Sequence, residues 1–530
     1  MEHSVSSGES IAVLLGYFVV TLLIGWFSKQ RKVGAETFLN APSALPLPVV
    51  VFAYIAANCG AIEIVGLCAL AAQYGVQALH FYWIGAIPAM VFLALWMMPV
   101  YRQSGVHSVP EYLYERYGPS VRLMNACVQA FMMLLLAGIG LYAMAEVLAA
   151  VFGWSFGSSV ALSASIVLSY TLLGGFRATI YNEVFQLAVM IAGLAPLAVR
   201  CIGLFRANGF PHEGIQGHLW TQLPLRDTSA PLDRWGVVVG LGFVLSFGYW
   251  CTDFVLMQRA FAARTDAAAR QVPLWAGFGK LIFAGLVVLP GLAAHRLLPH
   301  LTHGARFDQS LPTMMKLLYG PGLLSLGLTA LAASLMSGFA ANISAIAAIW
   351  TEDIYRPCLR PDAPDQHYLH MGRWTLLLAT LIASLASYIT FLFSNLMENV
   401  QLIFSVLGSP FWAIFLLGML SRRTTARGAI TGFLAGALVA FVHLALVLRG
   451  FLHYGSMLGA DFYGAAYAFA VTVLVATAID TISPLPAVAP RRNRLVFSLK
   501  TAWEGPQVKR LWLLSALLLS ICATLNWLLR

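Results

Sequence analysis

The chain has 530 residues, of which 59% are hydrophobic and only 10% are charged. A soluble domain carries about 25% charged residues, so this composition indicates an integral membrane protein. The formal net charge of +10 is scattered among short loops and forms no basic patch, which argues against nucleic-acid binding. Most of the 7 cysteines lie in apolar stretches, a pattern that predicts neither disulfides nor a metal site.

Apolar blocks recur along the chain, and each is long enough to cross a hydrocarbon core of about 30 Å. We expect about fourteen spanning helices in an all-α polytopic membrane protein, with residues 1–530 forming one transmembrane domain. The first block, residues 8–27, lacks a signal-peptide pattern, so we expect it to be retained and the mature chain to begin near Met1. Most of the 32 Lys and Arg fall in alternate loops, and the positive-inside rule then favours an external N-terminus.

The remaining blocks group into two expected five-helix repeats and a C-terminal extension, at residues 45–205, 234–420 and 428–529, the last with three helices. The first helix of each repeat is interrupted by glycine and an acid. The interruptions read "NCGAIEIVG", which begins at Asn58, and "SFGYWCTDF", which contains Asp253. Paired interruptions at matching positions predict an inverted-repeat transporter with a binding site near the membrane midplane.

Glu63 stands inside the first interruption, where an ionised carboxylate costs about 2.5 to 3.5 kcal/mol on insertion scales. Such a residue should face a cavity or a partner, which makes Glu63 a candidate binding-site residue. Unwound backbone beside it would leave carbonyl groups free to hold a cation. The alternative is a protonated Glu63 that hydrogen-bonds to a neighbouring helix.

Lys280 is the only lysine well inside an expected span, and either Glu63 or Asp253 could pair with it. The alternatives are a purely structural ion pair or a lysine that extends its ammonium to the membrane surface. Glu146 and Asp480 also lie in apolar blocks, but near expected helix ends. For those two acids we favour a structural role.

The segment "ASLMSGFAANISAIAAIWTEDIY" places small and hydroxyl side chains on one expected helix, among them Ser334, Ser337, Asn342 and Ser344. Small residues usually indicate close helix packing, and hydroxyls beside a broken helix can also complete an alkali-cation site. The sequence has no zinc-protease pattern at Pro211–Gly214, no phosphate-binding loop and no suggested Ser, His and Asp set. We therefore expect neither catalysis nor a cofactor, apart from a sodium ion.

Several stretches, in the same order, resemble the sodium/solute symporter family, which includes bacterial galactose, proline and sialic acid transporters. They include "SVPEYLYERYG", "YTLLGGFRATIYNEVFQ", "YWCTDFVLMQRAFAARTDAAAR" and "GSPFWAIFLLGMLSRRTTARGAITGFLAG". The resemblance covers nearly the whole chain. It implies a LeuT-type fold of two inverted five-helix repeats and cation-driven solute uptake by alternating access.

The resemblance also implies a sodium site at the first interruption, completed by the later Ala-rich helix. Its ligands would be the backbone carbonyls of Ala56, Cys59 and Ser334 and the hydroxyl of Ser337. A second hydroxyl position of sodium-coupled members is Gly338 here, which predicts weaker sodium binding because a hard cation needs several oxygen ligands. An acid that relatives keep near the proposed inner exit of the ion is matched by Glu183.

The solute site of the sugar-transporting members is only partly retained. Three of its residues are matched by Asn58, Lys280 and Gln401. Other positions have changed, and here they are Glu63, Tyr82, Gly85, Asp253 and Val255. We expect the solute to be a small polar or zwitterionic organic molecule, bound by Asn58, Glu63, Tyr82, Asp253, Lys280 and Gln401.

Two uses of Glu63 follow from these changes. Glu63 could bind a cationic or amine-bearing solute, with Tyr82 and Trp83 supplying aromatic faces. Alternatively Glu63 could titrate, so that a proton replaces or assists sodium.

The expected function is uptake of a small polar solute, coupled to sodium or a proton, across the lipid bilayer of a bacterial plasma membrane. The alternatives are a transporter-like sensor that signals to a partner protein, and a channel. A channel is disfavoured because a lysine and two acids at the midplane would hold ions.

Overall fold

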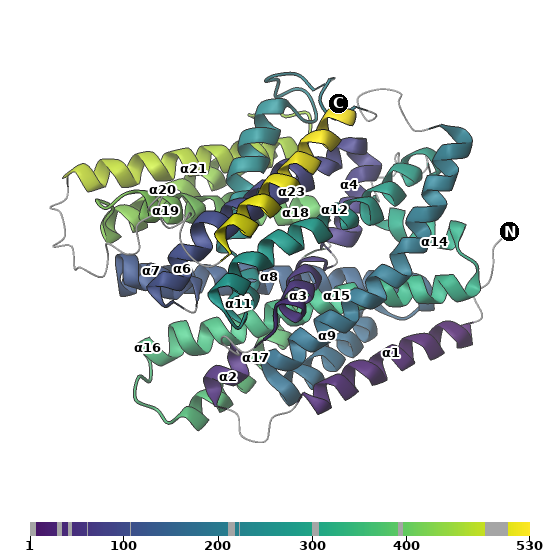
Figure 1. Ribbon diagram of the computed structural model, residues 1–530, viewed down its shortest axis with the longest axis horizontal. Helices are drawn as coiled ribbons and strands as arrows, with labels where there is room; N and C mark the ends of the chain where they lie inside the picture. Colours follow the sequence, from purple (N-terminus) through teal and green to yellow (C-terminus); the bar gives the residue numbers. More distant parts are fainter. Residues whose placement is uncertain are drawn as a thin grey trace. The chain divides into compact units, whose positions relative to one another are not determined.

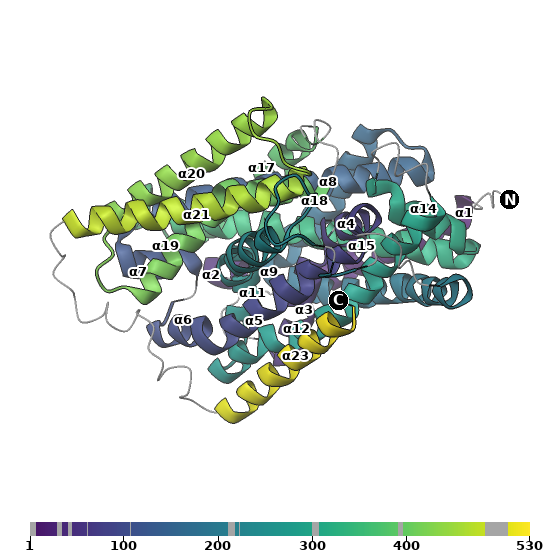
Figure 2. The same ribbon diagram turned by 90° about the horizontal axis from the view of Figure 1, so that it is seen from above.

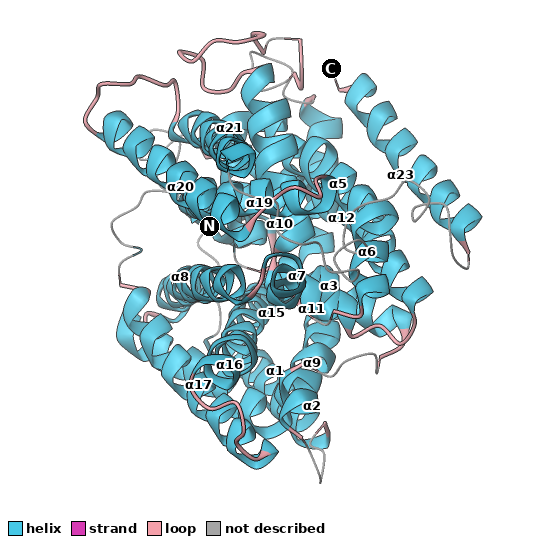
Figure 3. Cartoon of the chain, turned by 90° about the vertical axis from the view of Figure 1, so that its left-hand side faces the viewer, coloured by secondary structure: helices cyan, strands magenta, loops and turns pink. Residues whose placement is uncertain are grey.

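The computed structural model describes residues 7–28, 34–40, 45–60, 62–106, 108–209, 218–221, 223–298, 307–388, 390, 396–482 and 507–529. These residues form helices and connecting loops without a strand (Figure 3). Lys29, Arg31 and Lys32 and the basic stretch Arg491–Arg494, which contribute to the positive-inside argument, lie outside the described residues, as does Pro211–Gly214.

Eleven of the described helices are long and apolar enough to cross a membrane. The count becomes twelve if the bent pair Gly236–Thr252 and Phe254–Phe261 is one span, and two shorter apolar helices occupy Ile11–Phe27 and Leu47–Asn58. The protein is therefore a multi-pass membrane protein, as predicted. When each described helix is counted as one span, the number is eleven or twelve, below the expected number of about fourteen.

One reason for the lower count is helix α9 (Phe156–Asn208), which has 53 residues. At 1.5 Å per residue it would be about 80 Å long, more than twice the thickness of a hydrocarbon core. The helix is broken at Gly175, where φ is 60° and ψ is −153°. A Cβ atom there would lie 2.6 Å from Phe38, so glycine is required and α9 consists of two helical parts.

The chain divides into two compact units, and the first comprises Met1–Leu79, Met133–Gly217 and Gly279–Met397. Its centre is α15 (Pro321–Ala348), which packs against α9, and both contact α1 and α3 (Figure 1). The other elements with residues in this unit are α1 (Ser7–Phe27), α2 (Ala35–Leu39), α3 (Leu47–Asn58), η1 (Ile62–Gly66), α4 (Leu67–Tyr74), η2 (Gly75–Leu79), α8 (Pro119–Phe152), α12 (Asp266–Leu297), η7 (Phe307–Gln309), α14 (Ser310–Leu318), η8 (Ile349–Tyr355), α16 (Arg356–Cys358) and α17 (Asp365–Ala386).

The second unit comprises His80–Met132, His218–Phe278 and Glu398–Arg530 and also contains the start of α8 and of α12. The most extensive helix–helix contact in this unit is between α20 and α21, which run side by side (Figure 2). Its elements are η3 (Phe81–Ala86), α5 (Ile87–Phe92), η4 (Leu93–Met97), α6 (Met98–Ser104), α7 (Val109–Tyr117), η6 (Gly236–Ser246), α10 (Phe247–Thr252), α11 (Phe254–Phe261), α18 (Leu396–Ile403), η10 (Phe404–Gly408), α19 (Ser409–Leu420), α20 (Ala426–Leu448), α21 (Met457–Ile482) and α23 (Val508–Leu528).

Local chemistry explains where the helices that carry the site begin and end. Helices α3 and α15 each have a proline in the first turn, where its missing N–H costs no hydrogen bond. Helix α4 ends at Gly75, whose φ of 68° is readily adopted only by glycine. Between α3 and α4 lies the break that was predicted from "NCGAIEIVG".

Candidate functional site

The break begins where α3 leaves its regular hydrogen-bond ladder. In an α-helix the N–H of Gly60 would bond the carbonyl of Ala56, but here it donates to Asn58 O at 2.8 Å. The N–H of Glu63 likewise donates to Gly60 O at 3.1 Å, instead of to Cys59 O. The carbonyls of Ala56 and Cys59 are therefore released from the helix and available to other partners.

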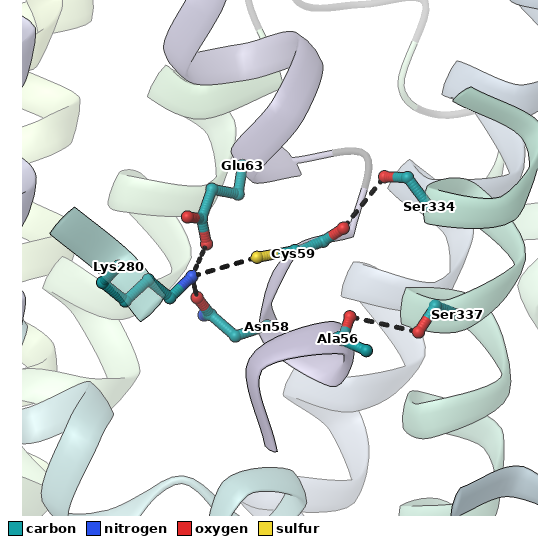
Figure 4. Close-up of polar contacts among 7 residues, drawn as sticks. All are labelled: Ala56, Asn58, Cys59, Glu63, Lys280, Ser334 and Ser337. Atoms are coloured by element: carbon teal, nitrogen blue, oxygen red, sulfur yellow. Dashed lines mark hydrogen bonds and ion pairs between the residues drawn. The ribbon is translucent and has the colours of Figure 1, made fainter. Parts of the chain in front are cut away.

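Two serines of α15 meet these released carbonyls (Figure 4). Ser334 Oγ donates to Cys59 O at 3.0 Å, and Ser337 Oγ donates to Ala56 O at 3.1 Å. The serines are one helical turn apart, so their hydroxyls lie on the same face of α15. Both are buried, and the four oxygens together are the kind of hard ligands that an alkali cation prefers.

Gly338 directly follows Ser337 on α15 and lies against Gly60 of the break. A Cβ atom on Gly338 would lie 3.3 Å from the Cα of Gly60, and a Cβ on Gly60 would lie 3.3 Å from the Cα of Gly338. The two glycines allow this close approach of backbones. They also leave position 338 without a hydroxyl.

On α12, Lys280 directs its ammonium at the same break (Figure 4). Its Nζ donates to Glu63 Oε2, to Asn58 Oδ1 and, at 3.3 Å, to Cys59 Sγ. Lys280 is completely buried and Glu63 is 6% exposed, so the ion pair is desolvated. The pairing of Lys280 with Glu63, one of the two expected, is present.

Glu63 lies in η1, a π-helical turn of five residues. Such wide turns are rare and occur frequently at functional sites. The turn follows Gly60, whose carbonyl accepts the N–H groups of both Glu63 and Ile64. The acid is therefore held on the first turn after the break, beside the released carbonyls.

The second predicted break is also present, in the second unit. Helices α10 and α11 meet at Asp253 in a bent pair with an angle of 47°. Asp253 is buried, and its Oδ1 accepts the N–H of Leu256 at 3.0 Å as the N-cap of α11. A capping role thus explains an acid at this position, which sequence reasoning assigned to the solute site and, alternatively, to an ion pair with Lys280.

Tyr82 and Gln401 lie in the second unit as well, and both are buried, in η3 and α18. In the same unit Gly85 faces Ser246, whose Oγ lies 2.4 Å from the place of a Cβ on Gly85. The hydroxyl of Ser246 in η6 therefore occupies the space that a side chain at position 85 would need.

Glu183 is completely buried in α9. Next to it, Asn182 donates to the carbonyl of Thr21 at 3.3 Å, which places this stretch of α9 against α1.

Asp480 accepts the N–H and the hydroxyl of Thr425 at 2.9 and 2.7 Å, an arrangement consistent with the expected structural role. Glu146 lies in α8, one and a half turns before its end at Phe152.

Sequence reasoning missed two features of the site. It assigned the backbone carbonyl of Ser334 to the ion, whereas the side-chain hydroxyl is the group that meets the break. It also missed the contact of Gly60 with Gly338, which the isolated pattern of glycines does not reveal. Among the described residues no three His, Cys, Asp and Glu side chains lie close enough to bind a metal ion.

Comparison with known proteins identifies a family and several relatives that agree with one another. The family model described as "Sodium:solute symporter family" matches residues 43–436. The chain is 26% identical over 466 residues to the sodium/glucose cotransporter of Vibrio parahaemolyticus, a match that covers 82% of this chain and 84% of that protein. It is 30% identical over 402 residues to a sodium/mannose cotransporter of Bos taurus, covering 68% and 66%.

Among solved structures, a substrate-bound, outward-open Na⁺-coupled sialic acid symporter matches with a TM-score of 0.75 at 18% identity. The match covers 91% of this chain and 99% of that one. At this identity the likeness shows that the two chains share a fold.

Proposed function

Because the chain belongs to the sodium:solute symporter family, we propose that it takes up a small polar organic solute together with a cation by alternating access. The observation that carries the proposal is the break after α3, where the carbonyls of Ala56 and Cys59 meet the hydroxyls of Ser337 and Ser334. Released carbonyls at a discontinuous membrane helix are the usual means of binding a coupling cation in such transporters.

The proposed fold has two inverted five-helix repeats of the LeuT type, over residues 45–205 and 234–420. Support for about fourteen spans comes from counting α1 as a span, α9 as two and the bent pair at Asp253 as one, with α3 and α4 forming a single broken span. We place the N-terminus outside a bacterial plasma membrane, on the distribution of Lys and Arg.

The cation would be held by Ala56 O, Cys59 O and the hydroxyls of Ser334 and Ser337. Sodium is the family's ion, and this ligand set suits it. Gly338 removes one oxygen, so the expected affinity is lower than with a hydroxyl at that position. Glu183 is the proposed acid on the inner exit path of the ion.

The solute would bind at Asn58, Glu63, Tyr82, Asp253, Lys280 and Gln401. The buried ion pair between Glu63 and Lys280 distinguishes this set from a sugar site built of neutral groups. A solute that carries charge can exchange contacts with the pair, whereas a neutral sugar only adds hydrogen bonds to it.

The test is uptake of labelled galactose, galacturonate, galactosamine and proline into proteoliposomes under an inward sodium gradient, an inward proton gradient or neither. We expect accumulation of at least one probe only when a gradient is present. Ser337→Ala should reduce the gradient-driven accumulation, because it removes one ligand oxygen.

Ser344→Ala is the matched control. It removes a hydroxyl from the same helix, but that hydroxyl lies 3.3 Å from Thr179 Oγ1 and away from the break. Uptake that is equal with and without a gradient, or no uptake of any probe, would count against the proposed function.

A further inference from the structure

Two amide side chains of α8 are buried with unsatisfied polar atoms. Asn125 is completely buried, and among the described residues neither its Nδ2 nor its Oδ1 has a hydrogen-bond partner. One helical turn further along, Gln129 is 4% exposed, and its Oε1 has no partner either. Residues four apart lie on the same face of a helix, so one bound group can contact both amides. Buried polar groups are almost always satisfied, and an exception calls for a bound water or ion.

The face of α8 that carries these amides meets the second break. Gln129 Nε2 donates to the carbonyl of Thr252 at 3.2 Å. Thr252 is the last residue of α10, and Asp253 continues the chain in an extended conformation, with φ of −63° and ψ of 129°. The carbonyls of the last turn of α10 are therefore released from the helix, as those of Ala56 and Cys59 are at the first break.

The end of α10 favours positive charge, because the free carbonyls of a helix C-terminus carry a partial negative charge. Besides that of Thr252, the carbonyl of Cys251 has left the helix, and it accepts the hydroxyl of Tyr101 at 3.2 Å. The hydroxyl of Thr252 donates to Gly248 O at 2.6 Å, which leaves lone pairs on its own oxygen. This end of the helix thus offers oxygens to a ligand.

The amide of Gln129 can add an oxygen to this set. A half-turn of the amide exchanges Nε2 and Oε1, so that Oε1 faces the carbonyl of Thr252. Two acceptor oxygens that face each other repel unless a cation lies between them. Asn125 Oδ1, one turn away on the same face of α8, supplies a third oxygen.

We propose that Asn125, Gln129 and the carbonyl of Thr252 bind an alkali cation at the break of the second unit. This cation is additional to the one at the first break, so the inference goes beyond the proposed function. Only the comparison between the two repeats rests on that function.

The groups at this break select a monovalent cation. Magnesium and calcium ions are usually held by carboxylates, whereas the carboxylate of Asp253 accepts the N–H of Leu256 at 3.0 Å as the N-cap of α11. An anion would meet free carbonyls and the same carboxylate. The cationic side chain of α11, Arg259, donates through Nη1 to Val255 O at 3.0 Å and to Gln258 Oε1 at 3.2 Å, so this nitrogen lies against α11 itself.

The two breaks correspond to each other in the proposed repeats. Helix α15 is the third helix of residues 234–420, and its serines meet the break after α3. Helix α8 is the third helix of residues 45–205, and its Gln129 meets the break after α10. Each repeat thus supplies one break and the helix that completes the cation site at the other break.

The test is equilibrium binding of radioactive sodium to the purified full-length protein in detergent, with choline replacing sodium at constant ionic strength. A parallel series uses radioactive rubidium as an analogue of potassium. We expect the wild type to bind two alkali cations at saturation. Asn125→Leu and Gln129→Met keep the outline of the side chain but remove its amide, and each should bind one cation.

Thermal unfolding of the same variants checks that they fold. In choline alone, Asn125→Leu should unfold at the wild-type temperature or above it, because an apolar group replaces an amide without partners. Adding the alkali cation should raise the unfolding midpoint of the wild type more than that of Asn125→Leu. A variant that is stable in choline and binds one cation fewer has lost a ligand and kept its fold.

Gln271→Met is the matched control. Gln271 is a buried amide in the same unit, 4% exposed, and its Oε1 also lacks a partner among the described residues. Its Nε2 donates to Ala267 O at 3.2 Å and to Gln507 Oε1 at 2.8 Å, groups that lie outside the break. This variant should bind two cations, like the wild type.

Two results overturn the second site. One is the binding of two cations by Asn125→Leu and Gln129→Met, as by the wild type. The other is a wild type that binds at most one cation, with an affinity that neither substitution changes, because the amides would then hold ordered water only.

Ser337→Ala separates this inference from the proposed function. It should weaken one of the two cation sites about tenfold and leave the site at Asn125 unchanged. A site that Asn125→Leu removes, without any site that Ser337→Ala weakens, would keep the second site and count against the first. Loss of the second site leaves the proposed function standing, since gradient-driven uptake tests that function independently.

Discussion

Two of the buried cations among the described residues are satisfied in different ways, Lys280 in the first unit and Arg116 in the second. Arg116 donates through Nε to Gly418 O at 2.8 Å and through Nη2 to Ser421 O at 2.6 Å. It also donates to the carbonyl and the hydroxyl of Thr424. Its partners are neutral groups at the end of α19 and the loop that follows, whereas Lys280 is paired with a carboxylate.

The difference separates a cation that fastens two segments from one that is paired with a charge at the break. The partners of Arg116 named above are carbonyl and hydroxyl groups, so this contact fixes α7 to the end of α19. Lys280 is held instead by the carboxylate of Glu63, beside the released carbonyls of the break. Burial of a cation alone therefore does not indicate a binding function.

Replacing Lys280 by methionine should have the largest effect on stability. It leaves Glu63 buried without its cation, which is expected to lower the free energy of unfolding by about 3–5 kcal/mol. Thermal unfolding in detergent would measure the loss. The double variant Lys280→Met with Glu63→Leu should recover most of it, and a double variant as unstable as the single one would show that the pair is not the cause.

Arg116→Lys tests the structural cation. A lysine cannot reproduce the planar fork of donors, so several hydrogen bonds to carbonyl oxygens are lost, with an expected cost of about 2–3 kcal/mol. Thermal unfolding in detergent would measure this loss. A variant as stable as the wild type would contradict the structural role of the guanidinium of Arg116.

Gly338 tests whether the sodium site lacks a ligand. Gly338→Ser and Gly338→Ala place the same Cβ 3.3 Å from the Cα of Gly60, so they share any cost of crowding. Only serine adds an oxygen, and we expect it to bind radioactive sodium about tenfold more tightly than the alanine variant, a difference of about 1.4 kcal/mol. Equal sodium affinity in the two variants would mean that position 338 does not face the ion.

His80, which lies between two spans, should give a smaller effect that depends on pH. Burial lowers the pKa of His80 from 6.5 to about 4, because the charged form of a buried ring lacks the solvation by water that stabilises it. One ring nitrogen contacts Leu219 O at 2.9 Å, and Nδ1 has no partner to accept from it when protonated.

The unfolded chain binds more protons than the folded one between pH 6.5 and about 4, so stability is full above pH 6.5 and falls as the pH is lowered through this window. We expect a loss of about 1 kcal/mol at pH 5.5 relative to neutral pH. The loss should be absent in His80→Gln. A wild-type midpoint that does not shift over this range would contradict a neutral buried histidine.

Much of the architecture was predictable from the sequence. Composition indicates a polytopic helical membrane protein, the quoted motifs indicate the family, and both are confirmed. The breaks at Asn58 and Asp253 follow from glycine and acid inside apolar blocks, since such residues are unfavourable in a continuous lipid-facing helix. The number of spans was less predictable, because one continuous helical run at α9 contains a turn that only Gly175 permits.

The site was predictable as a set of residues and less so as a set of contacts. Two acids qualified as partners of Lys280, and the choice of Glu63 depends on which helices α12 packs against, which a local pattern does not contain. Asp253 precedes an apolar helix, the ordinary position of an N-cap, and that signal could have identified its bond to Leu256. The meeting of Gly60 and Gly338 required the tertiary structure.

The most direct test of the proposed cation site at the first break is binding of radioactive sodium to the purified protein in detergent. The account predicts saturable binding that is about tenfold weaker at this site in Ser337→Ala, because one ligand oxygen is lost, and unchanged in Ser344→Ala. Sodium binding that is equally tight in the wild type and in Ser337→Ala would contradict the account.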